Sequence, residues 1–150
     1  MKRLIITIIM LGLAAAVFAD GSLVKFPDDF KSGIMYMEKA RGDVYEYLYT
    51  DKEAIEAAKA GRDLPYGTVI TLVEHYRESG ELKRYVVMEK QKGWGSEYPD
   101  NIRNGEWEYQ AFNADKSVQT EENLRRCFSC HKSQADDDYV FSYDKMKNYK

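Results

Sequence analysis

The chain has 150 residues, with 22 lysines and arginines against 25 aspartates and glutamates, so its formal net charge at pH 7 is −3. A mildly acidic chain lacks the clustered positive charge of nucleic-acid-binding proteins, and that class is excluded. About 130 residues remain once residues 1–19 are set aside, enough for one modest core but not for two domains.

Residues 1–19 have the pattern of a bacterial export signal. Lys2 and Arg3 form a short basic region, residues 4–17 are an apolar run, and Ala19 ends a Val-Phe-Ala cleavage site. The apolar run is too short for a membrane span and has no stop-transfer flank. We therefore predict a cleaved signal and a periplasmic mature chain, residues 20–150, without a membrane attachment. An uncleaved N-terminal anchor is the alternative.

The mature chain is expected to be mainly strands. Residues 32–40 and 43–49 carry Tyr, Met and Val at alternating positions, as half-buried strands do. Further strands are expected at residues 67–77, 82–90, 106–113 and 138–142. Hairpin-sized connections favour antiparallel pairing.

Two helices are expected between these strands. One covers residues 52–60 and is capped by Thr50 or Asp51. The other covers residues 120–132, with Thr120 as its cap. The predicted fold class is therefore α+β, a mainly antiparallel sheet with a few short helices.

The C-terminal helix carries the most informative motif of the chain, Cys127-Phe128-Ser129-Cys130-His131. C-x-x-C-H is the attachment motif of c-type haem. The two thiolates add to the haem vinyl groups, one helical turn apart, and the next residue presents its imidazole to the iron. We expect one haem c, held covalently by Cys127 and Cys130, with His131 as the proximal ligand. Its second ring proton would go to a backbone carbonyl or to water.

Two interpretations without haem stay open. A redox-active C-x-x-C normally follows a strand in a βαβ unit, and no such pattern is present. A zinc site needs four ligands, and Cys127, Cys130 and His131 would have to recruit the distant His75.

The other face of the iron depends on few side chains. Only 19 residues follow His131, and Met146, the one methionine among them, is too close along the chain to reach the opposite face. The remaining methionines of the mature chain lie in expected strands, where packing is commoner than ligation. His75 is the only other histidine, and a lone strand histidine is usually hydrogen-bonded or at the surface. We therefore predict an open distal side.

The chain resembles the cytochrome P-460 family, and within it the β-sheet cytochromes c-prime, from about residue 32 to residue 142. The haem motif alone is shared by every c-type cytochrome, whereas the segment after it is more specific. The resemblance is carried by Gly67-Thr68-Val69, Gly93-Trp94-Gly95, Trp107-Glu108-Tyr109, and C-x-x-C-H followed by Ala135-Asp136 and Tyr139-Val140-Phe141-Ser142. It implies a small antiparallel sheet that holds one haem and commonly forms a homodimer.

One position divides that family. Its hydroxylamine-oxidising members carry a lysine, cross-linked to the haem, on the strand that begins Gly-Thr-Val. The matching residue here is Leu72, and no lysine occurs between Gly67 and Arg77. The resemblance therefore implies the branch whose members bind gases in an apolar distal pocket. Leu72 would help to line that pocket, unless it is a core leucine that faces away from the haem.

These features predict an exported cytochrome that binds NO and CO, as a scavenger or sensor of NO. Both ligands bind without the hydrogen-bond donor that stabilises O2. The alternative is a periplasmic electron-transfer cytochrome with a redox partner protein, or an enzyme that oxidises hydroxylamine or NO. In an enzyme Glu89 could accept a proton if it faces the iron; otherwise it is a solvated glutamate.

Two charged groups flank the motif. Arg126, like its neighbour Arg125 or Lys132, could pair with a haem propionate, or could belong to the charged exterior of the helix. The run of three aspartates at residues 136–138 lacks the alternate oxygen spacing of a calcium loop and is expected to form a solvated turn.

Overall fold

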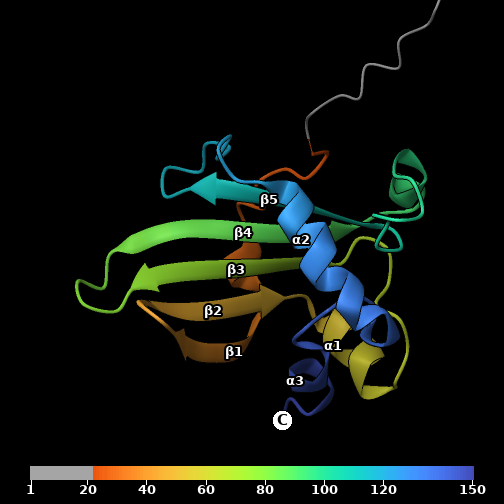
Figure 1. Cartoon of the computed structure of the whole chain (residues 1–150). Coiled ribbons are helices and arrows are strands. Elements are labelled where there is room, and N and C mark those ends of the chain that lie inside the picture. Colours follow the sequence, from red (N-terminus) through yellow and green to blue (C-terminus); the bar gives the residue numbers. More distant parts are fainter. Residues whose placement is uncertain (1–21) are drawn as a thin grey trace, which may run out of the picture.

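The computed structural model describes residues 22–150. The predicted export signal and its cleavage site lie outside these described residues. Within them, five strands form one antiparallel sheet whose spatial order follows the chain order (Figure 1). The strands are β1 (Ile34–Arg41), β2 (Val44–Thr50), β3 (Val69–Tyr76), β4 (Leu82–Lys90) and β5 (Trp107–Asn113).

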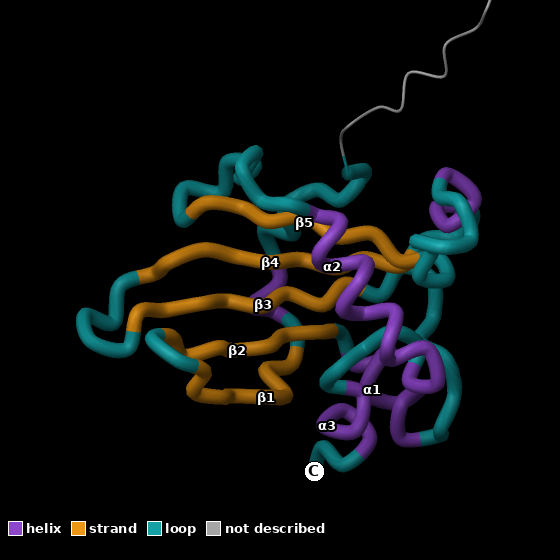
Figure 2. Tube along the Cα trace, in the orientation of Figure 1, coloured by secondary structure: helices purple, strands orange, loops and turns teal. Residues whose placement is uncertain are grey.

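Short helices lie on one face and at one end of the sheet (Figure 2). The helix α2 (Leu124–His131) contacts β5, while α1 (Lys52–Lys59) and α3 (Tyr143–Lys147) pack against each other. Three 3₁₀ helices are also present among the described elements: η1 (Phe30–Ser32), η2 (Trp94–Glu97) and η3 (Lys132–Asp137). No helix in residues 22–150 is long and apolar enough to cross a membrane.

The two faces of the sheet bury different side chains, because successive residues of a strand point to opposite faces. On the face that carries α2, hereafter the α2 face, one cross-strand row consists of Leu48, Leu72, Val86 and Ala111. The neighbouring row on the opposite face consists of Tyr47, Val73, Tyr85 and Phe112. The position of a residue along its strand therefore decides which of two cores it joins.

The structure confirms the predicted α+β class and its antiparallel sheet. The predicted strand at residues 82–90 coincides with β4, and Asp51 caps α1 by accepting a hydrogen bond from the Ala54 N–H at 2.6 Å. The predicted strand at residues 138–142 is wrong. Asp138 and Tyr139 adopt left-handed backbone angles, φ 51° and 62°, which turn the chain toward α3 instead of extending it.

The start of α2 also differs from the prediction. The helix begins at Leu124, and its cap is Asn123, whose side chain accepts a hydrogen bond from the Arg125 N–H. Thr120 lies before the helix because the preceding segment still follows β5. Val118 forms a β-bridge with Phe112 in that strand, so the residues around Val118 still pair with the sheet and the helix begins only after them.

Candidate functional site

The helix α2 turns one stripe of side chains toward the sheet. Leu124, Cys127, Phe128 and His131 have the i, i+3, i+4, i+7 spacing of one helix face, and each is at least half-buried. Phe128 is the anchor, because its ring packs within 4.8 Å of the Tyr109 ring centroid. The helix is thereby fixed against β5, and Cys127 and His131 keep a defined orientation to the sheet.

The two cysteines lie one helical turn apart, and both are free thiols. Cys127 is half-buried between α2 and the sheet, whereas Cys130 is exposed. Burial raises the pKa of the Cys127 thiol, so this side chain is protonated at neutral pH. Two free thiols at this spacing leave both sulfurs available for thioether bonds.

His131 ends α2, and its ring is held in one orientation. Its Nδ1 lies 2.7 Å from the carbonyl oxygen of Tyr139, and the ring packs between those of Tyr109 and Phe141, with centroids 4.8 Å and 5.1 Å away. A carbonyl oxygen only accepts, so Nδ1 carries the proton and Nε2 keeps its lone pair. Burial lowers the pKa of His131, which favours the neutral ring that a metal needs. The predicted backbone acceptor is thus the carbonyl of Tyr139.

That carbonyl is presented by the left-handed turn at residues 138–139. The Asp138 side chain is buried. It accepts a hydrogen bond from the Leu64 N–H at 2.8 Å and forms an ion pair with Lys90. The solvated turn predicted for residues 136–138 is therefore wrong for its last member. Asp138 lies inside because the backbone reverses there and points its carboxylate at the end of β4.

The loop before β5, which ends in an Asn-Gly turn, also holds α2. Asn104 is buried, and its Nδ2 donates to the Phe128 carbonyl at 2.8 Å and to the Tyr109 hydroxyl at 3.0 Å. Lys132, just after α2, donates to the carbonyl of Arg103 at 3.2 Å. The only sequence signal for this contact was the Asn-Gly pair at residues 104–105, which marks a turn but not the partner of that turn.

Leu72 lies on the α2 face and is half-buried against the core that contains Cys127. A leucine that faces away from α2 is therefore excluded. Its cross-strand partners are Leu48 and Val86, so the sheet presents an apolar strip at this level. The strip supplies no hydrogen-bond donor from its side chains.

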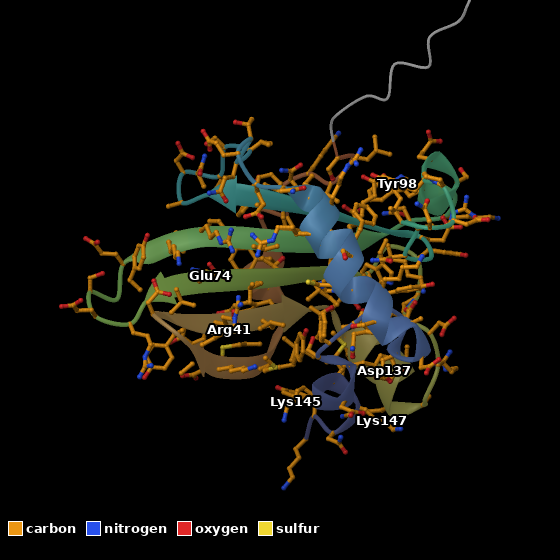
Figure 3. The ribbon with its side chains drawn as sticks, in the orientation of Figure 1. Arg41, Glu74, Tyr98, Asp137, Lys145 and Lys147 are labelled. Carbon is orange, nitrogen blue, oxygen red and sulfur yellow. The ribbon has the colours of Figure 1, made fainter. Side chains whose placement is uncertain are left out.

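An ion-paired cluster follows this strip along the same face. Glu46 and Glu74 are cross-strand partners, both buried, and Arg41 forms ion pairs with both. Figure 3 labels Arg41 and Glu74 on the sheet. Arg84 binds Glu74 at 2.7 Å and Glu122 at 2.6 Å. Arg84 thus ties the sheet to the segment that leads into α2.

Two residues considered as partners of the iron lie on the far face. Glu89 pairs across the sheet with Val69 and Glu108 and accepts a hydrogen bond from Gln91 at 2.7 Å. His75 binds the Gly80 carbonyl with Nδ1 at 3.0 Å. Neither side chain faces α2, because each lies at a strand position next to one that faces α2, and successive residues of a strand point to opposite faces of the sheet. Glu89 therefore lies on the face of the sheet opposite α2, and among residues 22–150 His75 is not grouped with Cys127, Cys130 and His131 as a zinc site would require.

The remaining predicted residues have clear positions. Arg126 is exposed on α2 and forms no ion pair with another residue of the described chain. Met146 is fully buried in α3. Among residues 22–150 no three Cys, His, Asp or Glu side chains are grouped as a metal-ion site would require.

A comparison with protein-family models finds one described as Cytochrome P460, which matches residues 27–142. The chain belongs to the cytochrome P460 family. The match includes all five strands and α2, so it covers both the sheet and the C-x-x-C-H segment. A comparison with curated proteins finds no match.

Membership of the cytochrome P460 family makes this protein a haem-binding cytochrome. The side chains of the site fit such a group. Two free thiols lie one turn apart, and the adjacent imidazole has Nδ1 bound to a carbonyl and Nε2 free as a ligand atom.

Proposed function

We propose that this cytochrome carries one haem c, bound through Cys127 and Cys130 and ligated by His131, and that its open distal side binds NO or CO. The observation that carries the proposal is the hydrogen bond from His131 Nδ1 to the Tyr139 carbonyl. It fixes the tautomer in which Nε2 can ligate iron, and it orients the ring. Ferrous haem with one axial histidine binds NO and CO at its other axial position.

The apolar strip supports a distal side without a protein ligand. Leu72 and its cross-strand neighbours offer no side-chain donor or ligand atom, and His75 faces the opposite side of the sheet. Bound O2 depends on a hydrogen-bond donor more than NO or CO do. The preference for NO over O2 would then come from the absence of a donor on this strip.

The cellular setting is part of the same proposal. Residues 1–19 would direct export to the periplasm, where the protein would scavenge or sense NO as a homodimer. The alternative is an electron carrier with a redox partner protein, for which a sixth ligand would have to close the iron site. Oxidation of hydroxylamine is less well supported, because Leu72 stands where the cross-linking lysine of such enzymes is expected.

The experiment is the absorption spectrum of the ferrous protein, made in a host competent for c-type maturation, before and after CO. We expect a broad five-coordinate Soret band that sharpens and shifts with CO. Sharp, split low-spin bands that do not change on addition of CO would contradict the open distal site and favour the electron carrier. Replacement of Cys127 and Cys130 by alanine should make the haem extractable by acidified acetone, whereas the unaltered protein should retain it.

Leu72→Gln tests the assignment of the distal strip. An amide donor beside bound O2 contributes one hydrogen bond, about 0.5–1.5 kcal/mol, so the affinity for O2 relative to CO should rise about two- to tenfold. Val73→Thr is the matched control, because the next residue of β3 faces the other core. Stopped-flow rates of O2 and CO binding give the ratio. If Leu72→Gln leaves it unchanged, Leu72 does not line the distal pocket.

A further inference from the structure

A buried ion pair lies behind the proximal side of the site. Lys90, the last residue of β4, places Nζ 2.8 Å and 2.9 Å from the two carboxylate oxygens of Asp138. Only 8% of the Lys90 side chain and 7% of the Asp138 side chain are exposed. Lys90 also donates to the Leu64 carbonyl at 2.9 Å, and Asp138 accepts from the Leu64 N–H. The pair therefore joins three segments that are distant in sequence.

Stability alone gives a weak reason for this pair. Burying two charges costs desolvation energy that their attraction recovers only with excellent geometry, and apolar side chains of similar size often stabilise a core equally well. Here the geometry is good, because Lys90 Nζ lies within hydrogen-bond distance of both Asp138 carboxylate oxygens, and it also lies 5.8 Å from the ring centroid of Trp107. A buried pair with such directional contacts can instead select one backbone conformation.

The conformation at stake is the turn at Asp138 and Tyr139. Both residues are left-handed, with φ 51° and 62°, and neither is glycine. Such residues persist only where the surroundings over-determine them. The Asp138 carboxylate is fixed by Lys90 and Leu64, and the Tyr139 N–H donates to the Gln134 carbonyl at 2.7 Å.

The turn has one contact that matters for the haem. It points the Tyr139 carbonyl at His131, with 2.7 Å between the oxygen and Nδ1. The strength of this hydrogen bond sets how much negative charge the imidazole shares with a metal on Nε2. A stronger bond makes His131 a better donor, which favours ferric over ferrous iron.

We propose that Lys90 and Asp138 are positioning residues for His131: their ion pair holds the left-handed turn that aims the Tyr139 carbonyl at Nδ1. The pair thereby tunes the iron–histidine bond and the reduction potential through His131. The inference rests on the proposed ligation by His131. In this proposal, Lys90 at the end of β4 and its partner Asp138 act on the iron from the side of His131, opposite the axial position that would bind a gas.

The test is the double variant Lys90→Met/Asp138→Asn in the haem-loaded protein. It replaces a neutral ion pair by a neutral apolar–amide pair, so the net charge near the iron stays the same. We expect the iron–histidine stretch of the ferrous protein, measured by resonance Raman, to shift to lower wavenumber. The midpoint potential should shift upward, because a weaker hydrogen bond makes the imidazole a poorer donor.

Val87→Ala is the control for a general loss of stability. Val87 is fully buried in the core on the opposite face, so its truncation should destabilise the fold while the stretch and the potential stay as in the unaltered protein. A double variant whose stretch and potential match the unaltered protein would overturn the proposal.

Two further results keep the test decisive. If the double variant does not fold, Asp138→Asn alone keeps the acceptor for Leu64 N–H and should show a smaller downward shift of the same stretch; no shift would again refute the inference. If the unaltered ferrous protein shows no iron–histidine stretch at all, the iron is not five-coordinate with His131 as its one axial ligand, and the proposed function fails before the role of Lys90 and Asp138 is tested.

Discussion

Replacing Asn104 by alanine removes two hydrogen bonds that hold α2 against the sheet. Asn104 is 1% exposed, and it donates to the Phe128 carbonyl and to the Tyr109 hydroxyl. Each bond contributes about 0.5–1.5 kcal/mol, and a buried partner left without a donor costs about 1–3 kcal/mol more. The Phe128 carbonyl keeps a second donor, the Lys132 N–H, so only the Tyr109 hydroxyl is left bare.

One effect opposes this loss. Asn104 Oδ1 is buried and has no partner within the described chain, so the substitution also removes an unsatisfied acceptor. The two terms together predict that Asn104→Ala lowers the free energy of unfolding by about 2 kcal/mol. The measurement is guanidinium unfolding followed by far-ultraviolet circular dichroism, on the haem-loaded protein.

Asn113→Ala is the matched control. Asn113 makes one exposed side-chain hydrogen bond, to Ser117 at 3.0 Å, so the same substitution there should change the free energy of unfolding by less than about 0.5 kcal/mol. If Asn104→Ala is as mild as Asn113→Ala, the hydrogen bonds of Asn104 do not hold α2 against the sheet.

Two other predictions concern the backbone and a buried carboxyl. Gly105→Ala and Gly42→Ala should each cost about 1–2 kcal/mol of stability, because both positions have left-handed φ, 56° and 59°. Of these two positions, only at Gly105 would the added methyl group contact another side chain, the Tyr139 ring at 3.1 Å. Only Gly105→Ala should therefore alter the iron–histidine stretch. Burial raises the pKa of Glu108, so the folded protein releases the Glu108 proton at a higher pH than the unfolded chain does. The stability contributed by Glu108 is complete below its ordinary pKa and is lost as pH rises through the raised value. Glu108→Gln should therefore gain in unfolding free energy relative to the unaltered protein between pH 4 and pH 7, and a constant difference would contradict the assignment.

The local parts of the site could be predicted from the sequence. The cysteines and His131 lie within five residues on one short helix, so their relative placement follows from helix geometry alone. The strand β4 was predictable for a similar reason, since its alternation depends only on neighbouring residues. Leu72 could be placed on a strand, and the family resemblance gave it a side.

The supporting parts of the site could not be predicted, because they depend on pairs that are far apart in the chain. Asp138 lies 48 residues from Lys90 and 74 from Leu64, and a run of three aspartates carries no local sign that its last member is buried. Glu89 shows the same limit in another form. A strand pattern tells which residues share a face, but only the packing of α2 decides which face is which, and Glu89 lies on the other one.

The two sides of the proposed haem site differ in their chemistry. The side of His131 is polar: a carbonyl fixes His131, and Lys90 holds the aspartate of the turn that presents this carbonyl. The strip around Leu72, which we propose as the distal side, is apolar and offers no hydrogen-bonding side chain. If this strip forms the distal side, as proposed, it cannot adjust the affinity for a gas through hydrogen bonds. Steric access and the strength of the bond from His131 to the iron are then the ways to adjust it. Substitutions around the Tyr139 carbonyl should therefore change gas affinity and potential together, whereas substitutions at Leu72 should change the choice between gases and leave the potential nearly constant.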